Sequence, residues 1–244
     1  MFAFILAAGL GTRLKPLTDR MPKALVPVAG KPLLEHQILR LKAAGCTCIV
    51  VNIHHFGDQI IDFLRQNDNF GMDIRISDER EMLLDTGGAL KKGLLQFPYD
   101  APVLVHNVDI LHNIDLRQFY ANYADTADAA LLVTQRETSR YLYFDEQQAL
   151  CAWQNVRTGA TKYVHHDTET LQGLHAGAFS GIHIFDPRLE RTMRDWPDKF
   201  SIIDFYLQAA QTHRIIGAEM SEAKILDVGK IDTLETADQF VENT

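Results

Sequence analysis

The chain has 244 residues, of which 46% are hydrophobic, so it can bury a sizeable core and is not expected to be disordered throughout. Its net charge of −8 argues against a general nucleic-acid-binding protein, which would be expected to be basic. The longest apolar stretch, "FAFILAA" from Phe2, is too short to span a membrane and follows no basic segment, so we expect neither a membrane span nor a signal peptide.

Strand and helix patterns alternate in the first half of the chain. Continuous apolar runs bounded by turns predict buried strands, and apolar residues at intervals of three and four predict helices. These patterns fall, in chain order, at 2–8 (strand), 32–45 (helix), 46–54 (strand), 56–68 (helix), 70–77 (strand), 86–97 (helix) and 101–110 (strand). This order predicts a parallel sheet with helices on both faces.

The pattern changes near residue 129, where strands follow one another with short connections. We expect strands at 128–136, 139–145, 149–155 and 175–185, and helices at 186–196, 201–213 and 232–243. The strands predict an antiparallel extension laid over the first half of the chain. Since no Pro- or Ser-rich linker interrupts the sequence, we predict a single domain over 1–244, with lobes at about 1–128 and 129–244.

Positive charge is concentrated near the N-terminus, in an otherwise acidic chain. Residues 1–31 carry five basic side chains against Asp19 alone. Such a cationic segment suits a small polyanion better than a long one. The more common role of a charged run is a solvated loop, and composition alone favours that interpretation.

Two glycines in this cationic segment follow the first predicted strand, where open α/β folds bind ligands. Gly9 and Gly11 lack a Cβ atom, so backbone N–H groups could close around phosphate oxygens. Arg13 could donate two hydrogen bonds to a phosphate, and Lys23 could place a point charge on one. A lone G-x-G is more often a simple turn, and "GLGTRL" fits neither the Rossmann fingerprint nor the P-loop.

The segment "LAAGLGTRLKPLTDRMPKALVPVAGKPLLEH" closely resembles the signature of the sugar-1-phosphate nucleotidyltransferases, also called nucleotide-sugar pyrophosphorylases. Ordered matches continue at "DTGGAL", "HNVDI", "AFSGIHIF" and "LDVGKIDTL". The resemblance implies an α/β fold with a Rossmann-like, mixed and mainly parallel sheet flanked by helices, and a smaller antiparallel extension that binds the sugar. It implies transfer of a nucleoside monophosphate from an NTP to a sugar 1-phosphate, with release of pyrophosphate.

The resemblance also implies roles for individual residues. Arg13 and Lys23 would be catalytic, acting on the phosphates. The nucleotide would be bound by Ala7, Ala8, Gly9, Gly11 and Thr12, and its base by Asp85, Thr86 and Gly87. The sugar would be bound by Asn107, Ser180 and Gly181.

Two aspartates are candidate ligands for Mg²⁺. Asp109 follows an apolar strand, and Asp227 stands in "ILDVGK" after a short apolar pair. Mg²⁺ prefers one or two carboxylates together with phosphate oxygens and water, and the two residues match the metal-binding pair of the family. Either aspartate could instead cap a helix, which is a common role for Asp after a strand.

Two segments of the sequence bear on which nucleobase and which sugar phosphate would be bound. Many relatives have a glutamine where this chain has "DEREMLLD", and "LLDTGGAL" is most similar to the short bacterial enzymes that make UDP-N-acetylmuramic acid or to GDP-mannose-type enzymes. Uridine or guanosine is therefore expected. The Glu-Lys-Pro segment with which relatives bind the sugar phosphate is not evident, and Lys162 is a candidate substitute.

Two other functions are compatible with the sequence. One is a nucleotidyltransferase that acts on a non-sugar phosphate, such as phosphocholine or the molybdenum cofactor, and another is a non-catalytic regulatory module that binds nucleotides. We expect small-molecule substrates, no nucleic-acid or membrane partner, and a monomer or homodimer. Cys46, Cys48 and Cys151 lack zinc-like spacing and predict reduced thiols in a cytoplasmic protein.

Overall fold

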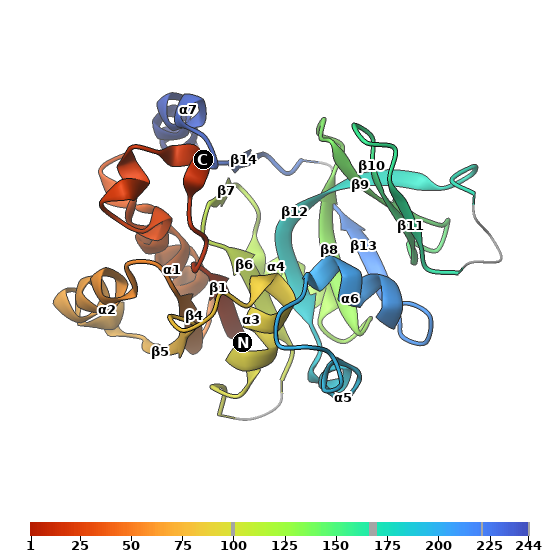
Figure 1. Ribbon diagram of the computed structural model, residues 1–244, viewed down its shortest axis with the longest axis horizontal. Coiled ribbons are helices and arrows are strands. Elements are labelled where there is room, and N and C mark those ends of the chain that lie inside the picture. The colour runs from red at the N-terminus through yellow and green to blue at the C-terminus, as the bar shows by residue number, and fades with distance from the viewer. Residues whose placement is uncertain (99–100, 166–169, 221, 244) are drawn as a thin grey trace.

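A mixed sheet runs through the computed structural model, which describes residues 1–98, 101–165, 170–220 and 222–243 (Figure 1). Its strands are β1 (Phe2–Leu6), β4 (Cys48–Ile53), β5 (Asp73–Asp78), β6 (Val103–Asn107), β8 (Ala129–Thr134), β9 (Arg140–Phe144), β10 (Leu150–Asn155), β11 (Thr161–Tyr163), β12 (His175–Phe185) and β13 (Ile215–Glu219). The strand order is β11-β10-β9-β12-β6-β1-β4-β5, while β8 pairs with β12 and with β13. The predicted mixed α/β fold is confirmed.

The N-terminal half supplies the parallel part of the sheet. Strands β5, β4, β1 and β6 lie side by side and run in the same direction. Leu6, the last residue of β1, pairs with Asn107, the last residue of β6. The loop after β1 and the polar residues after β6 therefore leave the sheet side by side.

The antiparallel part continues this sheet instead of lying over it. Strand β12 is antiparallel to β6. The N-terminal half of β12 pairs with β9, and β10 and β11 extend the sheet further outward from β9. The expectation of a layer over the first half was wrong, because β6 offers a free edge with which β12 pairs along its length. Strand β12 is long enough to pair with β6 through Ile182–Phe185 and with β9 through His175–Gly177.

Helices cover both faces of the sheet, as Figure 1 shows. They are α1 (Leu33–Ala44), α2 (Gly57–Gln66), α3 (Asp85–Leu94), α4 (Leu116–Tyr123), α5 (Glu190–Met193), α6 (Ile202–Ala209) and α7 (Ile231–Glu242). Apolar residues of α1, α2, α4 and α7 belong to one core cluster, and those of α3, α5 and α6 to the other. Strand β1 contributes alternate residues to the two clusters, as expected of a strand buried on both faces. No helix in the described part of the chain is long and apolar enough to cross a membrane.

Two small sheets lie beside the carboxyl ends of the parallel strands. One pairs β2 (Pro27–Val28) with β3 (Lys31–Pro32). The other pairs β7 (Ile110–His112) with β14 (Ile225–Asp227) in antiparallel register, so that Asp227 lies opposite Ile110. The N–H of Val228 also donates to the carbonyl of Asp109 at 2.8 Å. This pairing joins two aspartates that are far apart in the sequence.

The glycine pair of α3 is required by packing. The N–H of Gly87 donates to the carbonyl of Phe200 at 2.9 Å, so α3 is in direct contact with the segment 198–200. A Cβ atom at Gly87 would lie 2.3 Å from the ring of Phe200, and one at Gly88 would lie 1.9 Å from the carbonyl oxygen of Asp198. Both distances are far below any van der Waals contact.

Replacing Gly88 by alanine is therefore expected to lower the free energy of unfolding by about 1–3 kcal/mol, as overpacking of a core does. Urea denaturation would measure the loss. Gly9→Ala serves as the control, because nothing lies within 4 Å of a Cβ at that position. Equal stability of Gly88→Ala and Gly9→Ala would contradict the close approach of α3 to residues 198–200.

Three buried histidines lie on the strands around β6. Burial lowers the pKa of His106 to about 4 and that of His183 to about 3, and it places the pKa of His112 well below 6.5. Both ring nitrogens of His183 lack a hydrogen-bond partner among the described residues. An imidazole whose folded-state pKa is lowered stays neutral in the folded protein but takes up a proton in the unfolded chain, so its contribution favours unfolding as the pH falls below about 6.5.

We expect the free energy of unfolding to fall by roughly 2 kcal/mol per buried histidine between pH 7 and pH 5. His183→Leu should remove one such contribution, so this variant should lose less stability than the unmodified chain over that interval. The exposed His55, changed to Leu, is the control. An unchanged pH dependence in His183→Leu would show that this ring is not kept neutral by burial.

The three cysteines are free, and Cys46 and Cys48 are buried. Burial raises the pKa of Cys46 to about 12 and that of Cys48 to about 11, with nearby acidic charge adding to the second shift. These two thiols are therefore protonated and unreactive at neutral pH. The cytoplasmic location, the boundary between the two lobes and the choice between monomer and homodimer stay predictions.

Candidate active site

The loop after β1 is anchored by an asparagine of the neighbouring strand. The side-chain oxygen of Asn52, in β4, accepts hydrogen bonds from the N–H groups of Ala7 at 2.6 Å and Ala8 at 3.2 Å. Gly11 has a φ of 63°, a left-handed conformation that favours glycine. A Cβ there would also lie 2.7 Å from Cγ2 of Thr18. The predicted glycine turn is therefore present and needs Gly11.

The next part of the loop leaves its backbone donors available. Among the residues that the structure describes, none accepts a hydrogen bond from the N–H groups of residues 9–12. Those donors follow one another along the chain, as they do in backbone sites that bind phosphate. Of the predicted loop residues, Gly9, Gly11 and Thr12 could thus donate to a ligand, whereas the N–H groups of Ala7 and Ala8 already serve Asn52.

A buried lysine contacts the carboxylate that follows β6. Lys23 begins the 3₁₀ turn Lys23–Leu25, and its Nζ donates to the carboxylate of Asp109. Their side chains are 9% and 17% exposed, so the pair is largely shielded from water. Because both groups have lost most of their hydration, removing one partner would leave an uncompensated buried charge, which is costly.

Asp227 and Arg13 meet at the edge of the same site. A Cβ atom at Gly229 would lie 2.6 Å from Oδ1 of Asp227 and 2.8 Å from Nη2 of Arg13. Gly229 therefore leaves room for the carboxylate and the guanidinium to approach each other. Arg13 is exposed, so its guanidinium remains accessible to a ligand.

The charges around Asp227 act on each other. Asp227 is exposed, but surrounding protein atoms remove part of its hydration and raise the pKa of its carboxyl above the ordinary value, and the negative charge of Asp109 raises it further. Lys23, Arg13 and Arg136 oppose that rise. Two carboxylates that disfavour each other's charge are stabilised by a cation between them.

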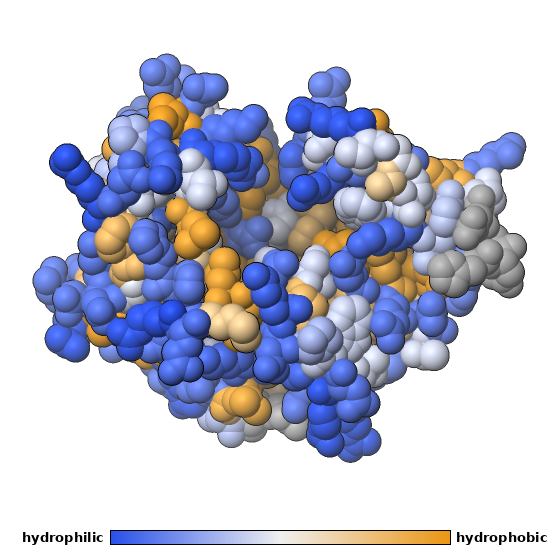
Figure 2. All heavy atoms as spheres, in the orientation of Figure 1, coloured by the Kyte–Doolittle hydropathy of each residue, from blue (hydrophilic) through white to orange (hydrophobic). Residues whose placement is uncertain are grey.

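These groups surround a cavity of about 530 Å³ at the carboxyl ends of the parallel strands. The predicted residues that line it are Ala7, Ala8, Gly9, Gly11, Thr12, Arg13, Lys23, Asp85, Thr86, Asn107 and Asp109. Gly229 lines it too. Asp227 does not line the cavity, but its carboxylate lies against Gly229. In the space-filling view the surface is hollowed between the half that carries α1 and α7 and the half that carries β9 and β10 (Figure 2).

The donor set fits Mg²⁺ when the ligand brings phosphate oxygens. In the described ranges, no three His, Cys, Asp or Glu side chains gather to hold a metal ion by themselves. Mg²⁺ does not need such a cluster, because it is usually bound by one or two carboxylates, by waters and by substrate phosphates. Asp109 and Asp227 provide two carboxylates beside a cavity with available backbone donors.

The segment predicted to meet the base is divided between two roles. Asp85 and Thr86 line the cavity. Thr86 also accepts a hydrogen bond at its Oγ1 from the N–H of Ile202 at 3.0 Å. Gly87 does not line the cavity, and its N–H is bonded to Phe200. In the structure Gly87 packs α3 against residues 198–200 and offers no free donor to a nucleotide.

Two buried polar residues of the site were not predicted. Glu79 is 1% exposed and lines the cavity together with Asn52. The side-chain amide of Asn52 donates to Oε1 of Glu79 at 2.8 Å, and the N–H of Leu84 donates to Oε2 at 3.1 Å. Burial raises the pKa of Glu79, while these hydrogen bonds oppose the rise. The signal in the sequence is Asn52 itself, a polar residue inside the apolar run "CIVVNI".

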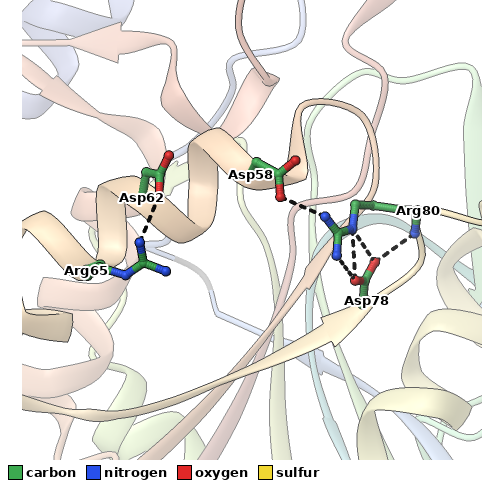
Figure 3. Close-up of polar contacts among 5 residues, drawn as sticks. All are labelled: Asp58, Asp62, Arg65, Asp78 and Arg80. Carbon is green, nitrogen blue, oxygen red and sulfur yellow. Dashed lines mark hydrogen bonds and ion pairs between the residues drawn. The ribbon is translucent and has the colours of Figure 1, made fainter.

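Exposed ion pairs hold the segment that carries Glu79. Nη1 of Arg80 bonds to Asp58 in the first turn of α2 at 2.7 Å, and Nη2 bonds to Asp78 at the end of β5 at 2.5 Å (Figure 3). Exposed pairs of this kind contribute little stability one by one. Together they connect α2 to the end of β5, next to a residue that lines the cavity.

The predicted sugar residues are only partly together. Asn107 lines the cavity, and its side chain lies against Gly181, where a Cβ would be 2.5 Å from Nδ2. Gly181 has a φ of 73°, so glycine is favoured there for two reasons. Ser180 is 1% exposed and does not line the cavity. Lys162 lies elsewhere, bonded to Asp204 at 2.6 Å and stacked over Trp153.

Comparison with known proteins supports the sequence resemblance. The sequence model of the family described as nucleotidyl transferase matches residues 2–157. The chain is 49% identical over 109 residues to N-acetylmuramate alpha-1-phosphate uridylyltransferase of Caulobacter vibrioides, covering 44% of this chain and 45% of that protein. It is 37% identical over 147 residues to mannose-1-phosphate guanyltransferase of Gibberella zeae, covering 58% and 40%. The matches thus span less than half the length of these relatives.

Solved structures share the fold. A putative glucose-1-phosphate thymidylyltransferase from Bacillus anthracis superposes with a TM-score of 0.80 at 19% identity, over 100% of this chain and 96% of that one. HddC from Yersinia pseudotuberculosis, solved with GMP-PN, gives 0.75 at 24% identity, over 98% of each chain. The predicted resemblance is confirmed, and the chain belongs to the nucleotidyl transferase family.

Proposed function

We propose that the protein transfers a nucleoside monophosphate from an NTP to a sugar 1-phosphate, giving an NDP-sugar and pyrophosphate. The observation that supports this most is the meeting of Arg13, Lys23, Asp109 and Asp227 beside one cavity with available backbone donors. A triphosphate needs cations and N–H donors, and a metal-bound triphosphate needs carboxylates. The names of the curated relatives, which are uridylyl- and guanylyltransferases for sugar phosphates, support the same class.

The reaction needs no nucleophile from the protein, because a phosphate oxygen of the sugar 1-phosphate can attack directly. A bond forms from that oxygen to the α-phosphorus of the NTP. The bond from the α-phosphorus to the bridging oxygen breaks, and pyrophosphate leaves with the electron pair. Catalysis would then depend on alignment of the two phosphates and on stabilisation of negative charge.

The side chains have distinct tasks in this reaction. The exposed guanidinium of Arg13 would bind the departing pyrophosphate with two hydrogen bonds, helped by the N–H groups of residues 9–12. Lys23, held by Asp109, would place positive charge at the α-phosphate. Asp109 and Asp227 would hold Mg²⁺, which supplies further neutralisation of phosphate charge when it is bound.

The base would lie against the segment between β5 and α3. Glu79 provides a buried carboxylate at the cavity, supported by Asn52 and by the N–H of Leu84. Carboxylate oxygens accept hydrogen bonds only, and every nucleobase presents at least one N–H donor on its pairing edge, so Glu79 could bind a base but does not by itself select one. Uridine and guanosine triphosphates are the expected donors because relatives named as a uridylyltransferase and a guanyltransferase match this chain.

The test is a matrix of nucleoside triphosphates against sugar 1-phosphates, scored by release of pyrophosphate in the presence of Mg²⁺. We expect release only when both substrates are present, with UTP or GTP as the preferred donor. Phosphocholine in the acceptor row tests the non-sugar alternative. Binding of an NTP without pyrophosphate release from any pair would favour a non-catalytic nucleotide-binding protein and would overturn the proposal.

A further inference from the structure

A second cavity has a volume of about 310 Å³. Thr134 and Arg136 line it where the chain leaves β8, and Glu219 lines it at the end of β13. Ile225 also lines it and belongs to β14, two residues before Asp227. Strand β14 therefore connects this cavity to the carboxylates of the proposed active site.

Arg136 is fixed in this cavity without an acidic partner. Within the described residues its Nη2 donates to the carbonyl of Phe179 at 3.0 Å, while its Nε is shielded and has no partner. Glu219, the acid in the same cavity, accepts a hydrogen bond from Gln135 at 3.0 Å instead. Leaving a shielded guanidinium N–H unpaired is costly, so a ligand, an ion or a water molecule is needed to satisfy it.

Thr134 gives an independent sign of a ligand at the same place. It is 8% exposed, and its hydroxyl has no hydrogen-bond partner among the described residues. Thr134 is the last residue of β8 and Arg136 follows it by two positions, and both line the same cavity. A hydroxyl and a guanidinium together suit a phosphate oxygen, which can accept from both.

Arg136 also lies on the side of the proposed active site that carries Asp227. Ile225 lines the same cavity as Arg136 and stands two residues before Asp227 in β14. In the proposed reaction, Arg13 serves the triphosphate and Lys23 is paired with Asp109. Lys162, the candidate from the sequence, is paired with Asp204. The acceptor phosphate also needs a cation. Lys199 lines the first cavity, and Arg136 lines the second, on the side of the site that carries β14.

We propose that Arg136 and Thr134 bind the phosphate of the acceptor, a sugar 1-phosphate, and so take over the task of the missing Glu-Lys-Pro lysine. This inference depends on the proposed function for its substrate class. It assigns the acceptor to the β8–β14 side of the site and the triphosphate to the glycine loop. Variants of Arg136 should therefore change the KM for the sugar phosphate without changing the KM for the NTP.

The kinetic test compares Arg136→Gln, Arg136→Lys and the control Arg157→Gln, which alters an exposed arginine between β10 and β11. Loss of a hydrogen bond to a charged group predicts a KM for the sugar 1-phosphate raised about 10- to 100-fold in Arg136→Gln. Arg136→Lys should recover part of this loss, since it keeps the charge without the planar fork. The KM for the NTP should stay within about twofold in all three, and an unchanged sugar-phosphate KM in Arg136→Gln would overturn the inference.

Thr134→Val separates a ligand-binding hydroxyl from one that is merely buried. If the hydroxyl binds the acceptor, this variant raises the KM for the sugar 1-phosphate severalfold while the protein unfolds at the same or a higher temperature. If the variant is only more stable, with an unchanged KM, Thr134 has no part in the site and the inference is wrong for this residue.

Calorimetry keeps this test apart from that of the proposed function. Mannose 1-phosphate and N-acetylmuramic acid 1-phosphate would be titrated into the unmodified chain, Arg136→Gln and Arg157→Gln, with no NTP present. Binding that Arg136→Gln alone weakens supports the assignment even if no NTP is turned over. Equal binding in all three proteins, or none to the unmodified chain, contradicts it.

Discussion

Replacing Asp109 by asparagine is expected to lower turnover at saturating substrates by at least about 10²-fold while the protein stays folded. Asparagine has nearly the same size and can still accept a hydrogen bond from Lys23, so the local packing should survive. The variant removes one of the two carboxylates proposed to hold Mg²⁺ and leaves the buried charge of Lys23 without its counter-charge. The measurement is kcat for pyrophosphate release at several Mg²⁺ concentrations, with the thermal unfolding temperature recorded in parallel.

The control for this variant is Asp62→Asn, which alters an exposed carboxylate on α2 that pairs with Arg65 on the same helix (Figure 3). It should behave as the unmodified protein does, both in rate and in its requirement for Mg²⁺. A near-normal rate in Asp109→Asn would show that this carboxylate neither holds a metal nor orients Lys23 for the reaction.

The second large effect is expected from Arg13→Ala, which should reduce kcat by about 10²- to 10³-fold. Its guanidinium is exposed and lies close to Gly229 and Asp227, where the departing pyrophosphate is proposed to bind. Charge that develops on the leaving group in the transition state would lose its bidentate partner, so kcat should fall more than substrate binding weakens. The kcat of Arg13→Lys should lie between that of Arg13→Ala and that of the unmodified protein, because a lysine keeps the charge but cannot donate two parallel hydrogen bonds as a guanidinium does.

Arg20→Ala is the matched control, since Arg20 is an exposed arginine of the same loop that does not line the cavity. Single-turnover measurements would separate the chemical step from product release. If Arg13→Ala and Arg20→Ala slowed the reaction equally, the positive charge of the loop as a whole, and not the position of Arg13, would be responsible.

Much of the fold could be predicted because its signals are local. Continuous apolar runs at β1, β4 and β6, and the helical spacing of α1 and α2, are readable from single segments. Because parallel strands end at one edge, the glycine loop and Asp109 could also be expected to meet. That expectation is confirmed by the register of β1 against β6.

Other elements escaped prediction because their stability comes from distant partners. Strands β11 and β14 are three residues each and are held only by pairing, so they leave little pattern in the sequence. Helix α4 was missed although Asp115 caps it by accepting from the N–H of Gln118 at 2.9 Å. A search for an Asp before an amphipathic stretch would have found this helix.

In the candidate site, too, the features that depend on distant partners could not be predicted from the sequence. The pairing of β14 with β7 places Asp227 opposite Ile110, the residue that follows Asp109. No periodicity in the sequence predicts this pairing. Asn52 and Glu79 are hydrogen-bonded although they are 27 positions apart in the sequence. Asn52 also accepts from the backbone of the loop after β1, and both residues line the cavity. Gly87 was expected to bind the nucleotide, but its place against Phe200 could be recognised only once residues 198–200 were in position.

Asp109 and Asp227 are proposed to bind one Mg²⁺ jointly with a triphosphate held by the glycine loop. The most direct measurement is the affinity for Mn²⁺, followed by its electron paramagnetic resonance signal, with and without a non-hydrolysable UTP or GTP analogue. Weak binding of the ion alone, strong binding with the analogue, and loss of the strong binding in both Asp109→Asn and Asp227→Asn are predicted. Strong binding that persists in either variant, or an affinity that the analogue does not change, would show that the two aspartates do not hold the ion together with the triphosphate.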